Sequence, residues 1–457
     1  MTSAPLAQGS APFRPMMDRY FFFPLLCIYV MVVQFGSLGR YSDAESSFGL
    51  STVIVAIFVL FGMQRLVWAT IGERVFWVIG LLLLYLVIPS VMSEEPIKSL
   101  LMLLQVACYI ALAAVASRTF LSRSQVFTLW VCIAAGLFVS AALTIVDFAG
   151  LVDVPHNNDL WLTTKVGAEQ VEQASGFFMR RSGMAAIFSI GIAGSLVFAL
   201  AHASLAVRLF FLVTGSTGLL CVFLTHNRSG VLGPLAIVMV YALVSPRFRG
   251  LRKIGMLMVS IVIGMSFFFF IVRYYPEHAS IYTAKLGFLG LSDTTWESDY
   301  LRIDLFIAAM RSMGSKPLGN GFSMVRLPSG IWLNAHNVVT AIIWAAGIFS
   351  LVWLPIFAAT VFSYFRGTPS RRGGVRRPSS VENDAVMCGL FTWLANGMTH
   401  NSLQTGLAWL LFGVLISGRY FSARLAPDSV SAVPTSQANR KFENGISGYG
   451  PPVTGSG

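Results

Sequence analysis

Charged residues are scarce in this sequence. They make up 11% of its 457 residues, whereas hydrophobic residues make up 55%. Apolar runs occur almost end to end, and many approach the roughly 20 residues that a helix needs to cross about 30 Å of lipid. The composition therefore predicts an all-α, polytopic integral membrane protein rather than a set of soluble domains.

The apolar runs also lack ionisable residues. Apart from Asp147 near the end of its run, their interiors contain no Asp, Glu, Lys, Arg or His. Ion-coupled transporters usually carry such groups at mid-membrane, at a cost of about 2.5–3.5 kcal/mol each, so the pattern disfavours a transporter. We expect about ten to twelve transmembrane helices, near residues 20–37, 46–63, 75–93, 99–117, 124–147, 182–201, 209–224, 230–245, 254–272, 337–365, 385–399 and 402–418.

Several chemical signatures are missing. The five cysteines all fall inside predicted spans, and no CxxC or His/Cys spacing suggests zinc. The sequence has no GxxxxGK[ST] phosphate loop, no DxD pair, no GxSxG elbow and no HExxH motif. We therefore expect no metal, no cofactor and no nucleotide-using active site that faces the cytoplasm.

The formal charge of +12 is unevenly distributed. Basic residues crowd the loops on one side of the predicted spans, as in PRFRGLRK and RGTPSRRGGVRRPSS. Because Lys and Arg in short loops mark the cytoplasmic side, both termini are expected in the cytoplasm. The excess charge then indicates adhesion to anionic membrane lipids rather than nucleic-acid binding.

The sequence divides into one membrane domain and a tail. Residues 1–418 are interpreted as a single integral membrane domain. Residues 419–457 are rich in Gly, Ser, Pro and Asn, and are expected to form a disordered cytoplasmic tail. Two long loops, 148–181 and 273–336, are expected on the outer face, and the second is expected to be partly folded.

The second outer loop contains a helix signature. In TTWESDYLRIDLFIAAMRSMG, Thr294 and Glu297 form a potential capping box, and Gly314 with Pro317 supplies a stop. Apolar residues recur at helical spacing between these signals, so we expect an amphipathic helix on the outer surface. The stripe consists of Leu301, Leu305, Ala308 and Ala309.

Histidine and arginine gather on the predicted outer face. Four of the six histidines precede an asparagine, at His156, His226, His336 and His400. Such pairs can simply form turns at helix ends, and arginines at membrane boundaries can simply snorkel. Taken together, the outer arginines form a candidate anion site, because guanidinium groups bind phosphate oxygens bidentately. They are Arg180, Arg181, Arg228 and Arg302.

Three segments carry a family resemblance. THNRSG, SDYLRIDLFIAAMRSMGSKPLGNGF and NAHNVVTAIIWAAGIFSLVWL resemble, in this order, the signature segments of the O-antigen ligase and Wzy-type polysaccharide polymerase superfamily. The resemblance covers about residues 176–365. It implies a GT-C-type glycosyltransferase of the bacterial inner membrane that is active on the periplasmic face. The implied enzyme needs no metal, and its donor substrate is a glycan linked to polyprenyl diphosphate.

The resemblance also implies residue roles. Arg228 and Arg302, with Arg180 or Arg181, would hold the diphosphate, and His336 would activate or orient the acceptor hydroxyl. The resemblance assigns no role to His226 or His400, which together with Asn337 are candidate glycan contacts. Family members often have a glutamate nine residues after this histidine, where this sequence has Ala345.

Three functions stay open at this level. The first is polymerisation of lipid-linked repeat units into exopolysaccharide or O-antigen, with or without a chain-length-regulating partner. The second is a ligase that transfers finished glycan to a lipid A core or another acceptor. The third is a flippase or transporter without enzymatic activity, which the empty span interiors disfavour.

Overall fold

A computed structural model provides the coordinates of the chain, which divides into two compact units, Met1–Gly418 and Arg419–Gly457. The structure describes residues 18–35, 50–119, 122–152, 163–166, 169–172, 181–225, 227–248, 273, 296–327, 332–333, 335, 337–365, 380–398, 403 and 405–424.

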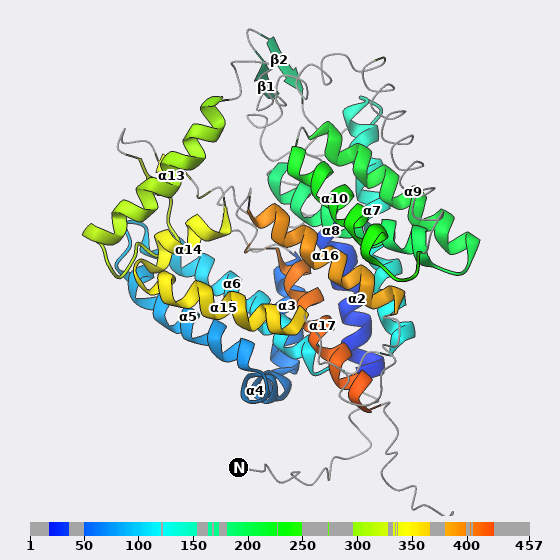
Figure 1. Ribbon diagram of the computed structural model, residues 1–457, viewed down its shortest axis with the longest axis horizontal. Helices are drawn as coiled ribbons and strands as arrows, with labels where there is room; N and C mark the ends of the chain where they lie inside the picture. Colours follow the sequence, from blue (N-terminus) through cyan, green and yellow to red (C-terminus); the bar gives the residue numbers. More distant parts are fainter. Residues whose placement is uncertain are drawn as a thin grey trace, which may run out of the picture. The chain divides into compact units, whose positions relative to one another are not determined.

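The described residues are mostly helical (Figure 1). A π-helical turn (Asp18–Phe22) opens the first helix and a 3-10 turn (Val33–Phe35) closes it. The α-helices are α2 (Phe23–Val32), α3 (Leu50–Phe61), α4 (Met63–Gly72), α5 (Arg74–Val91), α6 (Pro96–Ser117), α7 (Arg123–Phe148), α8 (Arg181–Ala201), α9 (Leu205–Leu224), α10 (Arg228–Val244), α13 (Trp296–Ser315), α14 (Val338–Ala346), α15 (Phe349–Phe365), α16 (Val381–Gly397) and α17 (Gly406–Arg424).

Five of the described helices are long and apolar enough to cross a membrane, namely α5, α6, α7, α8 and α9. A sixth span results if α3 and α4, which are bent by 76° at their junction, are counted together. Shorter apolar helices cover Tyr20–Phe35, Ser229–Val244, Phe349–Ser363 and Gly406–Ser417. These helices are consistent with a membrane protein. The full number of spans stays a prediction, and the span expected at 254–272 lies outside the described residues.

Two expected spans are broken. Residues 337–365 do not form one helix, because α14 ends at Ala346 and α15 begins at Phe349. The span expected at 46–63 ends at Phe61, and the chain turns at Gly62 into α4 instead of a loop. A side-chain carbon at Gly62 would lie 2.5 Å from the Val115 Cγ1 atom of α6, so this corner requires glycine.

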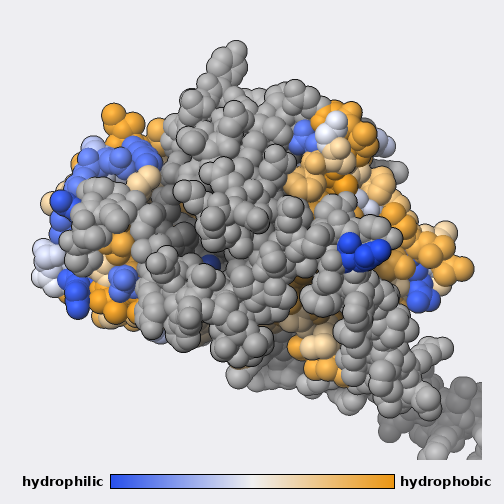
Figure 2. Space-filling model, turned by 90° about the horizontal axis from the view of Figure 1, so that it is seen from above, coloured by the Kyte–Doolittle hydropathy of each residue, from blue (hydrophilic) through white to orange (hydrophobic). Residues whose placement is uncertain are grey.

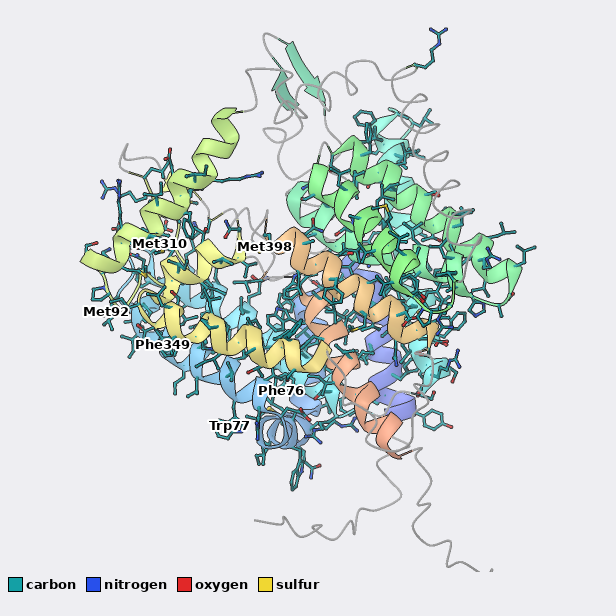
Figure 3. The ribbon with its side chains drawn as sticks, in the orientation of Figure 1. Phe76, Trp77, Met92, Met310, Phe349 and Met398 are labelled. Carbon is teal, nitrogen blue, oxygen red and sulfur yellow. The ribbon has the colours of Figure 1, made fainter. Side chains whose placement is uncertain are left out.

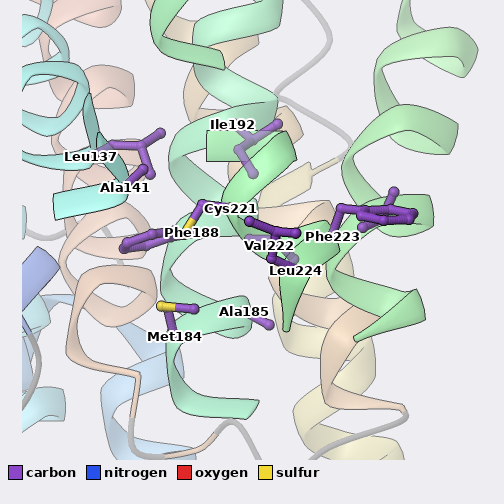
Figure 4. Close-up of a cluster of buried hydrophobic side chains, with 11 residues drawn as sticks. Leu137, Ala141, Met184, Ala185, Phe188, Ile192, Cys221, Val222, Phe223 and Leu224 are labelled. Carbon is purple, nitrogen blue, oxygen red and sulfur yellow. The ribbon is translucent and has the colours of Figure 1, made fainter. Parts of the chain in front are cut away.

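Helices α7, α8, α9 and α10 share a core of apolar side chains. Phe188 and Ile192 of α8 pack between Leu137 of α7 and Val222 of α9 (Figure 4). Gly218 allows α9 to approach closely, because a side-chain carbon there would lie 3.0 Å from Ile192. Because lipid chains are as apolar as these side chains, the core is held mainly by close van der Waals packing between the helices. This core holds the end of α9 and the start of α10 in place.

The described surface also exposes many large apolar side chains. Leu84 of α5 is 72% exposed and Leu60 of α3 is 69% exposed. Seen from above, apolar side chains cover much of the described surface on both flanks, and hydrophilic ones form separate groups (Figure 2). Apolar surface on helices of this length is expected where lipid replaces water as the solvent.

Two short antiparallel ribbons interrupt the helices. β1 (Thr163–Val166) pairs with β2 (Glu169–Glu172), so that Val166 lies opposite Glu169. β3 (Val325–Arg326) pairs with β4 (Trp332–Leu333). The first ribbon falls in the expected loop 148–181 and the second in the expected loop 273–336. The sequence patterns above predict neither ribbon.

Candidate functional site

The polar break between α9 and α10 is a capped helix start. The Asn227 side chain accepts a hydrogen bond from the Gly230 backbone N–H at 3.0 Å and another from Ser229 Oγ at 2.9 Å. Thr225, the last residue before the break, is buried and donates from Oγ1 to the Val222 carbonyl. Asn227 and Thr225 therefore satisfy backbone groups that the helix ends leave free.

The first turn of α10 lies close to its neighbours. A side-chain carbon at Gly230 would lie 2.6 Å from Val222 Cγ1 and 2.9 Å from Ala185 Cβ, so a larger residue does not fit. Pro234, four residues later, has no N–H to donate to the Gly230 carbonyl. The helix start is thus fixed against α8 and α9, with its N–H groups at the break.

A second His-Asn pair has the same construction. The Asn337 side chain accepts a hydrogen bond from the Thr340 backbone N–H at 2.6 Å and caps α14. Asn227 and Asn337 therefore each form a polar turn at a helix end, which is one of the two readings that the sequence allows for the His-Asn pairs. In both places the histidine immediately precedes the capping asparagine in the sequence. Partial positive charge at a helix start favours anions, so each of these helix starts is a candidate anion site.

The turn PLGNG docks on the break between α14 and α15. The backbone N–H of Asn320 donates to the Trp344 carbonyl at 2.9 Å, and that of Gly321 donates to the Ala345 carbonyl at 3.2 Å. In return, the Ile348 N–H donates to the Pro317 carbonyl at 2.9 Å. The turn thereby satisfies carbonyl groups that the end of α14 leaves without helical partners.

Helix α13 reaches the same junction. The Asn320 amide contacts Ser312 Oγ of α13 at 3.5 Å, and α13 packs against α14. Figure 1 shows the two helices spreading apart from this end. Arg302 lies nearer the other end of α13 and is partly buried. Ala345, at the position where the family often has glutamate, is 1% exposed, so a carboxylate there would enter a closed apolar environment.

The end of α16 contacts α10. Asn396 is 1% exposed and donates from its side-chain amide to Ser189 Oγ of α8. A side-chain carbon at Gly233 of α10 would lie 3.8 Å from Asn396 Oδ1 and 4.0 Å from Thr392 Cγ2. Thr392 Oγ1 is buried without a hydrogen-bond partner among the described residues. A small cluster of neutral polar groups therefore lies just beyond the first turn of α10.

The same end of α16 also borders α14. An apolar cavity of about 170 Å³ is lined by side chains of α5, α6, α14, α15, α16 and α17, among them Val338, Val339, Trp393 and Met398. Met398 follows directly after α16, is 65% exposed and is labelled in Figure 3. The end of α16 therefore packs beside Gly233 of α10 and lines the same cavity as the start of α14.

The structure describes some of the predicted site residues completely, some only in their backbone, and some not at all. Arg181 and Arg228 are the first residues of α8 and α10, and their side chains lie outside the described set. Arg302 is on α13, and Asn337 caps α14. Whether these residues share one cavity stays a prediction. Arg180, His226, His336 and His400 lie outside the described residues.

The sequence patterns do not predict the polar groups of α16 and α8. Ser189, Thr392 and Asn396 are neutral, so a search for ionisable residues does not find them. Their signal is a buried amide in an apolar run, which must find a hydrogen-bond partner on a neighbouring helix. Where the structure describes the chain, three or more His, Cys, Asp or Glu residues nowhere gather as potential metal ligands.

The chain was compared with known proteins. No family model matches it. No curated protein matches it at a significant level either. The relationship to the O-antigen ligase and polymerase superfamily thus depends on the three segments quoted above and stays a prediction.

The capping role of Asn227 can be tested. We expect Asn227→Ala to destabilise the protein by about 1 kcal/mol, because the Gly230 N–H loses its acceptor. Asn227→Ser keeps an oxygen at the cap and is expected to lose about half as much or less. Thermal unfolding of the detergent-solubilised protein measures both. Equal losses in the two variants would contradict capping as the main role of this side chain.

Proposed function

We propose that this protein is a glycosyltransferase of the bacterial inner membrane, active on the periplasmic face with both termini in the cytoplasm. It joins polyprenyl-diphosphate-linked oligosaccharide repeat units into exopolysaccharide or O-antigen. The observation that carries the proposal is that the end of α16 contacts α10 near Gly233 and also lines one cavity with Val338 and Val339 at the start of α14.

The donor diphosphate fits the electrostatics of this end. Two helix starts direct backbone N–H groups toward it, and helix starts favour anions. Arg228, Arg302 and Arg180 or Arg181 add guanidinium groups, which keep their charge at every physiological pH. Because a diphosphate is already a good leaving group, the protein mainly has to stabilise the charge that develops on its oxygen. The arginine guanidinium groups and the positive ends of the two helix dipoles supply this stabilisation.

The apolar cavity fits part of the lipid carrier. Its volume of about 170 Å³ is close to that of an apolar protein cavity of about 150 Å³ that takes up benzene, so it has room for a short stretch of isoprenoid chain. Val338 and Val339 line it from the first turn of α14. A chain in this cavity would therefore place its diphosphate near Asn337 and His336.

The reaction follows from this placement. The acceptor hydroxyl oxygen forms a bond to the anomeric carbon, while the bond from that carbon to the diphosphate oxygen breaks and the diphosphate leaves with the bonding electrons. The His336 imidazole accepts the hydroxyl proton, because a neutral imidazole is available near physiological pH. His226, His400 and Asn337 contribute glycan contacts at the rim. The acceptor is the next lipid-linked repeat unit.

Deletion of the gene tests the proposal. We expect single repeat units to accumulate on polyprenyl diphosphate in the periplasmic leaflet, with loss of polymer. Mass spectrometry of extracted lipid-linked glycans, with periplasmic access of a glycosidase, measures both. Long lipid-linked chains without transfer would instead identify a ligase that uses a lipid A-type acceptor. Repeat units confined to the cytoplasmic leaflet would identify a flippase, and an unchanged glycan profile would exclude all three activities.

A further inference from the structure

Helix α13 is apolar on two faces. Its inward face packs against the protein, where Leu305 and Ala309 are 1% and 0% exposed. This face includes the apolar stripe expected from the sequence, except that the side chain of Leu301 is outside the described set. A second stripe points away from the protein. It consists of Ile303, Phe306, Ile307 and Met310, which are 36–55% exposed.

The spacing of the second stripe makes it continuous. Its members follow the i, i+3, i+4, i+7 pattern of one helix face. Polar residues flank it, since Asp304 and Arg311 lie seven residues apart on one border, and Arg302 lies on the other. Large apolar side chains between charged borders are typical of a helix that lies in the interface plane of a membrane.

The contacts of α13 locate its C-terminal end beside the end of a potential membrane span. Lys316, just after α13, forms an ion pair with Glu94, which comes three residues after the end of α5 (Nζ to Oε1, 3.5 Å). The Tyr85 hydroxyl of α5 donates to the Leu318 carbonyl at 3.0 Å. Because α5 is long and apolar enough to span the membrane, its end lies near the lipid headgroups.

The direction of α13 also agrees with an interfacial helix. In Figure 1 it extends away from the end of α5, in a different direction from both α5 and α15. Ile88 and Met92 at the same end of α5 are also exposed, at 53% and 69%. Met310 and Met92 are labelled on the same side of the view in Figure 3. Exposed apolar side chains therefore occur both on α13 and at the end of α5 that α13 contacts.

We infer that the face of α13 formed by Ile303, Phe306, Ile307 and Met310 binds the acyl-chain region of the membrane leaflet at the end of α5. The helix then lies in the membrane surface and holds Arg302 at the depth of lipid phosphates. A lipid-bound α13 requires only that α5 crosses the membrane, so it does not depend on the proposed reaction. A second copy of the chain or a partner protein could cover such a face instead, and the test distinguishes these cases.

A labelling scan tests the lipid contact on the full-length protein. Single cysteines at Ile303, Ile307 and Met310 carry a fluorophore, and cysteines at Asp304, Arg311 and Ser315 on the polar arc of the same helix serve as matched controls. Unsubstituted protein treated in the same way gives the background of the native cysteines. The purified variants are placed in phosphatidylcholine and phosphatidylglycerol vesicles with a spin-labelled quencher in the upper acyl chain.

We expect quenching by the lipid-borne quencher to be at least about twofold stronger at the three stripe positions than at the three controls, with a helical period. Iodide in the water phase should give the opposite order. Equal quenching at all six positions, or stripe labels that only iodide reaches, would overturn the inference. Cross-links between two Ile307→Cys chains, with stripe labels shielded from both quenchers, would instead identify a dimer contact. None of these readouts depends on catalysis.

Discussion

Replacing His336 with alanine is expected to lower polymer formation by at least about 100-fold, while the amount of protein in the membrane stays unchanged. The imidazole is proposed to accept the proton of the attacking hydroxyl, and its loss removes general-base catalysis. His336 precedes the cap of α14 in the sequence, so Asn337 and its hydrogen bond to Thr340 remain in place. Quantification of polymer in a deletion strain that carries the variant measures the effect.

His202 provides the matched histidine control. It follows α8, stacks on Phe127 with ring centroids 5.5 Å apart, and has no role in the proposed site. We expect polymer formation by His202→Ala to stay within about twofold of wild type, because His202 follows the end of α8 opposite Arg181 and is outside the proposed site. Wild-type polymer from His336→Ala would remove that residue from the proposed chemistry. Equal losses in both variants would indicate a general effect on folding.

The same polymer assay tests the proposed role of the arginines. Arg228→Ala and Arg302→Ala are expected to lose about 100-fold to 1000-fold in polymer formation if each guanidinium stabilises the leaving diphosphate. Arg311→Ala is the matched control for Arg302, since both are on α13 but Arg311 is exposed on the border away from Arg302. The assay is the polymer quantification used for His336. Similar activity of Arg302→Ala and Arg311→Ala would exclude a special role of Arg302.

Hydrophobicity predicts the helices of this protein but not their breaks. Residues 337–365 form a nearly uninterrupted apolar run. Hydrophobicity averaged over such a run does not reveal a single residue with a positive φ. Gly347 has a φ of 54°, and its neighbours bind the PLGNG turn, which lies about 30 residues earlier in the sequence. The break thus results from a contact that is distant in the sequence. The same holds for the corner at Gly62, which lies against Val115.

The sequence likewise predicts some features of the candidate site and not others. Local signals predict the polar turns at Asn227 and Asn337, because capping depends on residues within one helical turn. They do not predict that the end of α16 packs beside α10 and lines a cavity with α14, since both contacts depend on packing between helices. Asn396 forms its hydrogen bond with Ser189, 207 residues away. Similarly, the sequence shows two apolar stripes on α13, but only the packed structure shows which of them faces inward.

Replacing Gly347 with valine is expected to destabilise the protein by about 3 kcal/mol or more. Gly347 has a φ of 54° and a ψ of −136°, a region that residues with side chains rarely enter. A side-chain carbon would also lie 2.2 Å from the Pro317 carbonyl oxygen and 2.6 Å from the Gly319 N. Both atoms belong to the turn that docks on α14, so relief of the clash would separate the turn from the helix.

Gly314→Ala is the matched control for this change. Gly314 lies inside α13 and has no atom within 4 Å of the place where a side-chain carbon would be, so alanine should be neutral or stabilise by about 0.5–1 kcal/mol. Thermal unfolding of the two detergent-solubilised variants, monitored by size-exclusion chromatography, gives the change in stability of each. A Gly347→Val protein that unfolds like wild type would show that the junction tolerates a different backbone. Because α14 starts next to His336, a displaced junction should also lower polymer formation, although Gly347 is outside the proposed site.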